Sequence, residues 1–497
     1  MLFSSSIFVF GFLPICLIFY YLIPNRKIRN LFLFLASILF YAWGEPVFVL
    51  IMLSSIILNY IFGMLVEKYN YNKLTSKILI VIMLIFNLGI LFVFKYIGFF
   101  VTNINEIFNL NLYVPKIPLP IGISFFTFQA ISYVIDVYRR TDSDGDVIRA
   151  QKNPVNVGLY IALFPQLIAG PIVRYKTVAE QINKRHENFN DFSEGVRRFI
   201  IGLSKKVLLS NNLALIADRA FSVQPDEISV SFAWLGAICY SLQIFFDFSG
   251  YSDMAIGLGK MFGFHFLENF NYPYISKSVS EFWRRWHISL GSWFRDYVYF
   301  PLGGSRKGIK RTIFNLSVVW FLTGFWHGAN WTFMSWGMYF FIFIAIEKFI
   351  DIRNKKKRKD EDGKDSIPIL VLKHTYAVLV AVFGWVLFRS DTIEYAVQYI
   401  KSMLGLNGNS LMDNLTILYV NENIVFLICS IIFSMPIVEY VKKKYKALMD
   451  KREIDKGYGI LEICYDFGYV ALYIGVFLIT MSFIIKGAYN PFIYFNF

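Results

Sequence analysis

Two histidines stand in surroundings that set them apart from the rest of this apolar chain. His327 lies in the triplet Trp326, His327, Gly328, and no Lys, Arg, Asp or Glu occurs between Arg311 and Glu347. If Arg311 marks a membrane surface, helical residues at ~1.5 Å each place His327 ~24 Å inward, beyond the bilayer midpoint. A histidine at that depth should be neutral and able to accept a proton, as a general base must. The alternative is a core histidine satisfied by a backbone carbonyl.

His287 lies in a segment dense in arginine and tryptophan. Residues 283–295 contain three of each. Guanidinium forks pair with phosphate groups, and indole rings are flat stacking surfaces. The segment therefore favours binding of a nucleotide-bearing thioester donor or a lipid headgroup. The candidate binding residues here are Trp283, Arg284, Arg285, Trp286 and Arg295.

A glycine-rich turn follows at residues 303–308. Its backbone amides, with the cations Arg306 and Lys307, could hold a phosphate. The same composition also suits an interfacial turn whose cations snorkel to water.

Upstream, Asp247 and Asp253 lie six residues apart at the end of an apolar run, with Tyr251 between them. The carboxylates could orient an arginine or a histidine in a polar cavity, or could cap a helix and pair with nearby arginines. Asp247 and Tyr251 join the candidate substrate-binding residues, as do Trp326 and Asn330 beside His327.

Signatures of common soluble enzymes are missing from the sequence. It contains no Walker A loop, no GxSxG elbow and no HExxH pair. The four cysteines, Cys16, Cys239, Cys429 and Cys464, are far apart and form no CxxC pair, so we expect neither a disulfide framework nor a metal site.

The composition indicates which class of protein holds these residues in place. Of 497 residues, 56% are hydrophobic and only 17% are charged, and the apolar residues form long blocks. This excludes a soluble multidomain protein and predicts an all-α, polytopic membrane protein. The net charge of +14 is explained by basic loops beside membrane helices, so no nucleic-acid partner is expected.

The distribution of basic clusters predicts about twelve full spans with both termini outside the cytoplasm. The first apolar run is interpreted as a retained span and not as a cleaved signal peptide, because no Lys or Arg precedes Arg26. The predicted spans are 7–24, 31–43, 47–66, 78–98, 119–137, 199–217, 231–248, 312–328, 331–349, 367–388, 423–440 and 466–485.

Two further segments, 154–172 and 281–308, cannot cross completely in this scheme. The first contains Pro165 and Pro171, and the second is too polar to face lipid. Both are interpreted as re-entrant segments around a central channel, where irregular backbone is tolerated. The alternative is that both lie along the cytoplasmic surface.

Four motifs together resemble the membrane-bound O-acyltransferase (MBOAT) family. The sequence reads FDFSGYSDMA at 246–255, FWRRWH at 282–287, YFPLGG at 299–304 and WHG at 326–328. They are most similar to the bacterial branch that acetylates alginate or transfers D-alanine to teichoic acid. The resemblance implies a single acyltransferase domain, 1–497, with a core at about 120–335 and flanking spans at 1–119 and 336–497.

The resemblance also implies a function and its participants. His327 matches the family's catalytic histidine, and His287 matches a second polar catalytic position. The donor would be acetyl-CoA or an acyl carrier protein, bound from the cytoplasm as a substrate, with no permanently bound cofactor. The acceptor would be a polysaccharide outside a bacterial cytoplasmic membrane, reached directly or through a hydrolase-like partner protein.

Other functions remain open from the residues alone. Buried polar residues and re-entrant segments also suit a transporter or channel, although no inverted repeat is detectable. A noncatalytic component of a polysaccharide export complex is a third hypothesis. Within the acyltransferase hypothesis, D-alanyl transfer to teichoic acid is the alternative to acetyl transfer.

Overall fold

The computed structural model describes residues 1–141, 145, 147–168, 170–357, 366–452, 460–487 and 489–491. Within these ranges the chain is helical and contains no β-strand, only an isolated bridge between Thr141 and Val147. The predicted all-α class is therefore confirmed.

The N-terminal part contains the elements up to the first broken segment. They are η1 (Phe8–Phe12), α1 (Leu13–Leu22), α2 (Arg26–Gly44), α3 (Val49–Lys68), α4 (Lys73–Leu91), η2 (Phe92–Tyr96), α5 (Ile97–Phe108), α6 (Ile123–Arg139), α7 (Pro154–Ala162), α8 (Phe164–Leu167) and α9 (Tyr175–Lys184). Asparagine side chains define two helix starts, because Asn25 caps α2 and Asn72 caps α4.

The middle of the chain contains the longest helix and the second broken segment. Its elements are α10 (Phe189–Ser204), η3 (Lys205–Ser210), α11 (Asn211–Ser222), α12 (Val230–Met261), η4 (Pro273–Ile275), α13 (Val279–Arg285), α14 (Ile288–Phe294), η5 (Arg295–Tyr299) and α15 (Gly308–His327).

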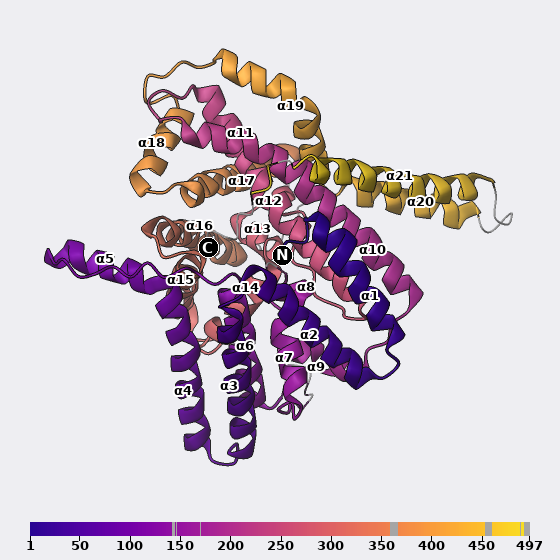
Figure 1. Ribbon diagram of the computed structural model, residues 1–497. Coiled ribbons are helices and arrows are strands. Elements are labelled where there is room, and N and C mark those ends of the chain that lie inside the picture. Colours follow the sequence, from indigo (N-terminus) through magenta and orange to yellow (C-terminus); the bar gives the residue numbers. More distant parts are fainter. Residues whose placement is uncertain are drawn as a thin grey trace.

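The C-terminal part consists of α16 (Trp331–Lys357), α17 (Ile367–Arg389), α18 (Ile393–Met403), α19 (Asn414–Phe433), α20 (Ile437–Arg452) and α21 (Ile460–Ile485). In Figure 1, α20 and α21 run side by side and project from the body of the protein, and Lys442 of α20 lies over the ring of Tyr469 in α21.

Eight of the described helices are long and apolar enough to cross a membrane, so this is a multi-pass membrane protein. The count of twelve full spans is not confirmed. The other four predicted spans are helical but shorter or more polar: residues 8–22, α2, α6 and α15. The predicted span 423–440 is displaced, because α19 ends at Phe433, before Pro436.

The two segments predicted not to cross are broken helices. Residues 154–172 form α7 and α8, which are almost completely buried, and the second segment forms α13, α14 and η5. Ala169 in the first segment lies outside the described residues. Burial against protein explains how irregular backbone is accommodated there.

Helix α12 is central and packs against α10, α11 and α17. Close approach between α10 and α12 depends on small residues. A Cβ at Gly250 would lie 2.7 Å from the carbonyl oxygen of Gly202, so neither position has room for a side chain. Such glycine contacts let membrane helices pack backbone to backbone.

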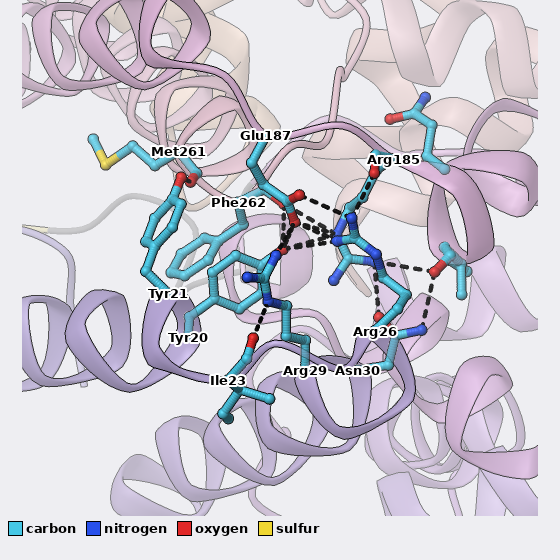
Figure 2. A network of polar contacts seen from close by, with 12 residues as sticks. Tyr20, Tyr21, Ile23, Arg26, Arg29, Asn30, Arg185, Glu187, Met261 and Phe262 are labelled. Carbon is cyan, nitrogen blue, oxygen red and sulfur yellow. Dashed lines mark hydrogen bonds and ion pairs between the residues drawn. The ribbon is translucent and has the colours of Figure 1, made fainter.

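A polar network ties the N-terminal helices to this core (Figure 2). Glu187, in the loop before α10, forms ion pairs with Arg26, Arg29 and Arg185 and accepts a hydrogen bond from Tyr20. Burial opposes ionisation of Glu187, but the hydrogen bonds and charge of Arg26, with the hydrogen bond of Tyr20, lower its pKa to about 2.

Candidate active site

The hairpin of α15 and α16 places His327. His327 is the last residue of α15, and the glycines of the two helices let them touch. A Cβ at Gly324 would overlap the carbonyl oxygen of Phe333, and one at Gly337 would overlap that of Trp320. His327 is thereby held against α16, where its ring centroid lies 5.1 Å from that of Trp336.

His287 occupies a sharp turn between α13 and α14. Its backbone is left-handed, with φ 44° and ψ 53°, a conformation that costs free energy for a residue with a side chain. The neighbouring backbone is held by hydrogen bonds from Ile288 N to Asn269 O and from Ser289 N to Asn269 Oδ1. The turn directs the imidazole into the protein, where it is 3% exposed.

Trp326 neighbours both histidines. Its ring centroid is 4.9 Å from that of His327 and 6.1 Å from that of His287. Phe248 of α12 packs edge-on against His287 at 4.4 Å, and Phe388 of α17 packs against His327 at 5.2 Å. The structure therefore brings the two predicted catalytic histidines into one aromatic enclosure.

Both imidazoles have the properties that proton transfer requires. His327 is 6% exposed, and the Nε2 atom of His287 is buried with no hydrogen-bond partner among the described residues. A buried polar atom without a hydrogen-bond partner costs free energy unless a ligand or a water molecule supplies the missing hydrogen bond. Two buried, nitrogen-bearing rings in one aromatic cluster suit general acid–base chemistry.

Trp283 and Trp286 lie in a cluster of aromatic rings beside this enclosure. Trp283 packs against Trp320 at 4.9 Å and against Trp336 at 5.3 Å. Trp286 packs against Trp385 at 4.7 Å. These two predicted donor-binding residues support the walls of the site and stack on other protein rings.

The arginines of the same segment point elsewhere. Arg285 forms an ion pair with Glu281 at 2.8 Å and donates to the carbonyl of Asn271, and Arg284 is exposed. Arg306 and Lys307 are exposed in the turn before α15. The structure does not bring these four cations to the histidine enclosure.

Asp247 and Tyr251 lie one turn apart on α12, and both are buried. Asp247 forms an ion pair with Lys206 at 2.6 Å, with both side chains 1% exposed. Tyr251 stacks on Phe3 at 5.5 Å. Among the described residues, these contacts are an ion pair and a ring contact within the protein. They agree with the interpretation of Asp247 as a charge-pairing residue.

Asn330 caps the hairpin beside His327. Its Oδ1 accepts from the backbone of Thr332, and its Nδ2 donates to the carbonyl of Asp391. Asn330 therefore joins the start of α16 to the segment after α17, close to Phe388.

Arg295 lines a separate cavity of about 680 Å³. Its other cations are Arg139, Arg174 and Lys176, all from loops predicted to face the cytoplasm, and its acids are Asp136 and Asp296. Asp296 pairs with both Arg174 and Arg295, and Asp136 accepts a hydrogen bond from Tyr297. The lining carries an excess of positive charge.

A chain of stacked rings connects this cavity with the histidines. Tyr297 lies 5.1 Å from Trp293, which stacks on Phe128 at 3.8 Å and 7°. Phe128 in turn lies 5.6 Å from Trp326. A series of ring contacts therefore links Tyr297, which lines the cavity, with Trp326 beside the histidines.

Sequence reasoning missed several residues of these sites. The cations Arg139, Arg174 and Lys176 were used only to assign topology. Lys95 was not considered, although it contacts the backbone of Trp326. The available signal was that Lys95 is the single charge between Lys77 and Glu106 in an apolar run.

Apolar helices around a buried histidine pair define the chain as a multi-pass membrane protein. Comparison with known proteins gives its family. The model of the membrane-bound O-acyltransferase family matches residues 125–383. This chain belongs to that family and is a membrane O-acyltransferase.

Similar proteins include acetyl and D-alanyl transferases. A probable alginate O-acetylase of Pseudomonas aeruginosa is 42% identical over 82% of this chain and 75% of its own length. A peptidoglycan O-acetyltransferase of Helicobacter pylori is 34% identical over 83% of this chain and 81% of its own. A teichoic acid D-alanyltransferase of Bacillus subtilis is 29% identical over 48% of this chain and 60% of its own.

Proposed function

We propose that this enzyme transfers an acetyl group from a cytoplasmic thioester donor to hydroxyl groups of an extracytoplasmic polysaccharide, directly or through a hydrolase-like partner protein. The acetyl group and the polysaccharide acceptor are supported by the acetylases of alginate and peptidoglycan, which match more than four fifths of this chain. D-alanyl transfer is less well supported, because the D-alanyltransferase matches only 48% of it. The proposed location is the bacterial cytoplasmic membrane.

The observation that carries the mechanism is that His327 and His287, both buried, neighbour the same ring, that of Trp326. In the proposed reaction, His327 removes the proton from an acceptor hydroxyl, and the oxygen attacks the thioester carbonyl. A carbon–oxygen bond forms, the carbon–sulfur bond breaks, and the thiolate leaves and takes up a proton. His287 positions the donor and the developing charge.

The basic cavity supports entry of the donor from the cytoplasmic side. Acetyl-CoA and an acyl carrier protein both present a thioester on an arm that carries phosphate. Arg139, which donates to the carbonyl of Asp296, and Lys176 both line this cavity, and such cations pair with phosphate. The donor is proposed as a substrate, with no cofactor held between turnovers.

The experiment compares His327→Ala with the matched control His265→Ala. His265 has a side chain that is 52% exposed and pairs with Asp191, so it lies outside the enclosure. Purified full-length protein in lipid nanodiscs would receive [14C]acetyl-CoA and cell-envelope glycan. His327→Ala should lose transfer by at least about 1,000-fold, since removing a general base and its positioning costs roughly that much, whereas His265→Ala should retain it.

Two results would contradict the proposal. Transfer that persists in His327→Ala would remove the assigned base. Uptake of label into vesicles without covalent transfer would favour a transporter.

A further inference from the structure

Lys95 contacts the end of the helix that carries His327. It lies in the continuous helical stretch Lys73–Phe108, at the π-helical turn η2 (Phe92–Tyr96). Such widened turns are frequent at functional sites, because they redirect side chains. A charge within an apolar span costs free energy. A functional role for Lys95 is therefore the first explanation to test.

The contacts of Lys95 are with Trp326 and Ser124. Its Nζ donates to the carbonyl oxygen of Trp326 at 2.5 Å and to Ser124 Oγ at 3.3 Å. The ammonium also lies 5.7 Å from the centroid of the Trp326 ring. It therefore caps a backbone carbonyl at the C-terminal turn of α15, one residue before His327.

The adjacent residue makes a parallel contact without a charge. Tyr96 donates its hydroxyl to the carbonyl of Phe325 at 2.9 Å, and its ring stacks on that of Phe325 at 4.0 Å and 8°. Docking of η2 on α15 thus already has a neutral hydrogen bond and a ring stack. Docking alone does not explain why the neighbouring residue is a cation.

No carboxylate balances this cation in the part of the chain that the structure describes. The interactions of Lys95 there are with a carbonyl, a hydroxyl and a ring. A partly buried ammonium surrounded by neutral groups favours negative charge nearby, and the low dielectric constant strengthens this effect.

Lys95 also lines a small cavity beside the enclosure. Gly122, Ser124, Phe125, Ile168 and Trp326 complete the lining, and the volume is about 10 Å³, roughly that of one water molecule. Gly122 has φ 76°, and a Cβ there would lie 2.8 Å from the carbonyl oxygen of Leu167. The cavity thus admits one small polar group next to Trp326.

We infer that Lys95 is a positioning residue of the acyl-transfer site. Its ammonium fixes the Trp326 carbonyl and with it the imidazole of His327, and its unbalanced charge favours the negatively charged state formed when the acceptor oxygen attacks the thioester. The inference rests on the proposed role of His327, which a separate variant tests.

The experiment uses Lys95→Met, Lys95→Arg and Tyr96→Phe in full-length protein, with [14C]acetyl-CoA as the donor probe. Lys95→Met keeps the length of the side chain and removes the charge, and Tyr96→Phe removes the parallel hydrogen bond alone. We expect Lys95→Met to lower kcat on the order of 100-fold with an unchanged KM for the donor, as for loss of one charge-stabilising group. Lys95→Arg should recover at least about a tenth of wild-type kcat, and Tyr96→Phe should stay within about threefold of it.

The possible outcomes separate the alternatives. Lys95→Met within about threefold of wild type would overturn the inference. Equal losses in Lys95→Met and Tyr96→Phe, with no rescue by arginine, would also overturn it, because they indicate docking of η2 only. Retained transfer in His327→Ala would contradict the proposed function, on which the role of Lys95 rests. Loss in His327→Ala with full activity in Lys95→Met rejects only the role of Lys95.

Discussion

Lys206 and Asp247 form an ion pair of 2.6 Å inside the helix bundle, with each side chain only 1% exposed. Lys206 also donates to the carbonyl of Pro491, so the pair joins α12, η3 and the chain near its C-terminus. Removing one member of such a pair leaves an uncompensated buried charge. The pair gives Asp247 a structural role, and its role in substrate binding stays a prediction.

Asp247→Ala should therefore destabilise the protein by about 3–5 kcal/mol and leave the KM for the donor unchanged in the protein that remains folded. The double variant Lys206→Met/Asp247→Leu should recover most of that stability, because an apolar pair replaces the charged one. Thermal unfolding in detergent measures both. A raised KM with an unchanged unfolding temperature would instead restore the interpretation of Asp247 as a substrate-binding residue.

Gly337 offers a test of how the α15–α16 hairpin places His327. Gly337→Ala puts a methyl group against the carbonyl of Trp320 and forces the two helices apart. Overpacking of this kind costs about 1–3 kcal/mol, and a 1 Å displacement of a catalytic group can cost roughly 100-fold in rate. We expect kcat to fall at least about tenfold, measured by acetyl transfer.

The matched control is Gly475→Ala in α21, where an added Cβ meets no atom within 4 Å. It should leave kcat unchanged and keep or slightly raise stability, because alanine favours a helix over glycine. Equal activity in the two variants would show that close packing of α15 on α16 is unnecessary for the site.

The Glu187 network predicts a pH dependence of stability. The pKa of Glu187 is lowered to about 2 from its ordinary value of 4.5. The ionised carboxylate therefore stabilises the fold above about pH 4.5, and that stabilisation is lost as the pH falls from about 4.5 towards 2. Unfolding temperatures measured across this range should decline less steeply for Glu187→Gln than for the wild type. Parallel curves would exclude Glu187 as a source of the dependence.

Sequence patterns predicted the helical class and the burial of His327 well. Both follow from local features of the sequence, namely the length of apolar runs and the absence of charges. They did not give the direction of side chains. Trp283 was predicted to stack on a donor, yet its neighbours Trp320 and Trp336 come from α15 and α16. Lys95 and Trp326 are far apart in sequence, and no local pattern indicates that tertiary packing joins them.

The same limitation applies to the cations. Arginines near His287 in sequence were expected to hold the donor, but only Arg295 of them lines the cavity with excess positive charge, whose other cations come from distant parts of the sequence. Whether that cavity or the glycine-rich turn binds the phosphate of the donor can be measured directly with two double variants of equal charge change.

Arg139→Gln/Lys176→Gln removes two cations from the cavity, and Arg306→Gln/Lys307→Gln removes two from the exposed turn. The first should raise the KM for acetyl-CoA about tenfold, equivalent to about 1.4 kcal/mol, with little change in kcat. The second should stay within about twofold, since exposed cations contribute little. The effect of the cavity variant should shrink as salt rises from 0.05 to ~0.5 M, because salt screens charge on an open cavity. The reverse ranking of the two variants would assign the phosphate to the turn.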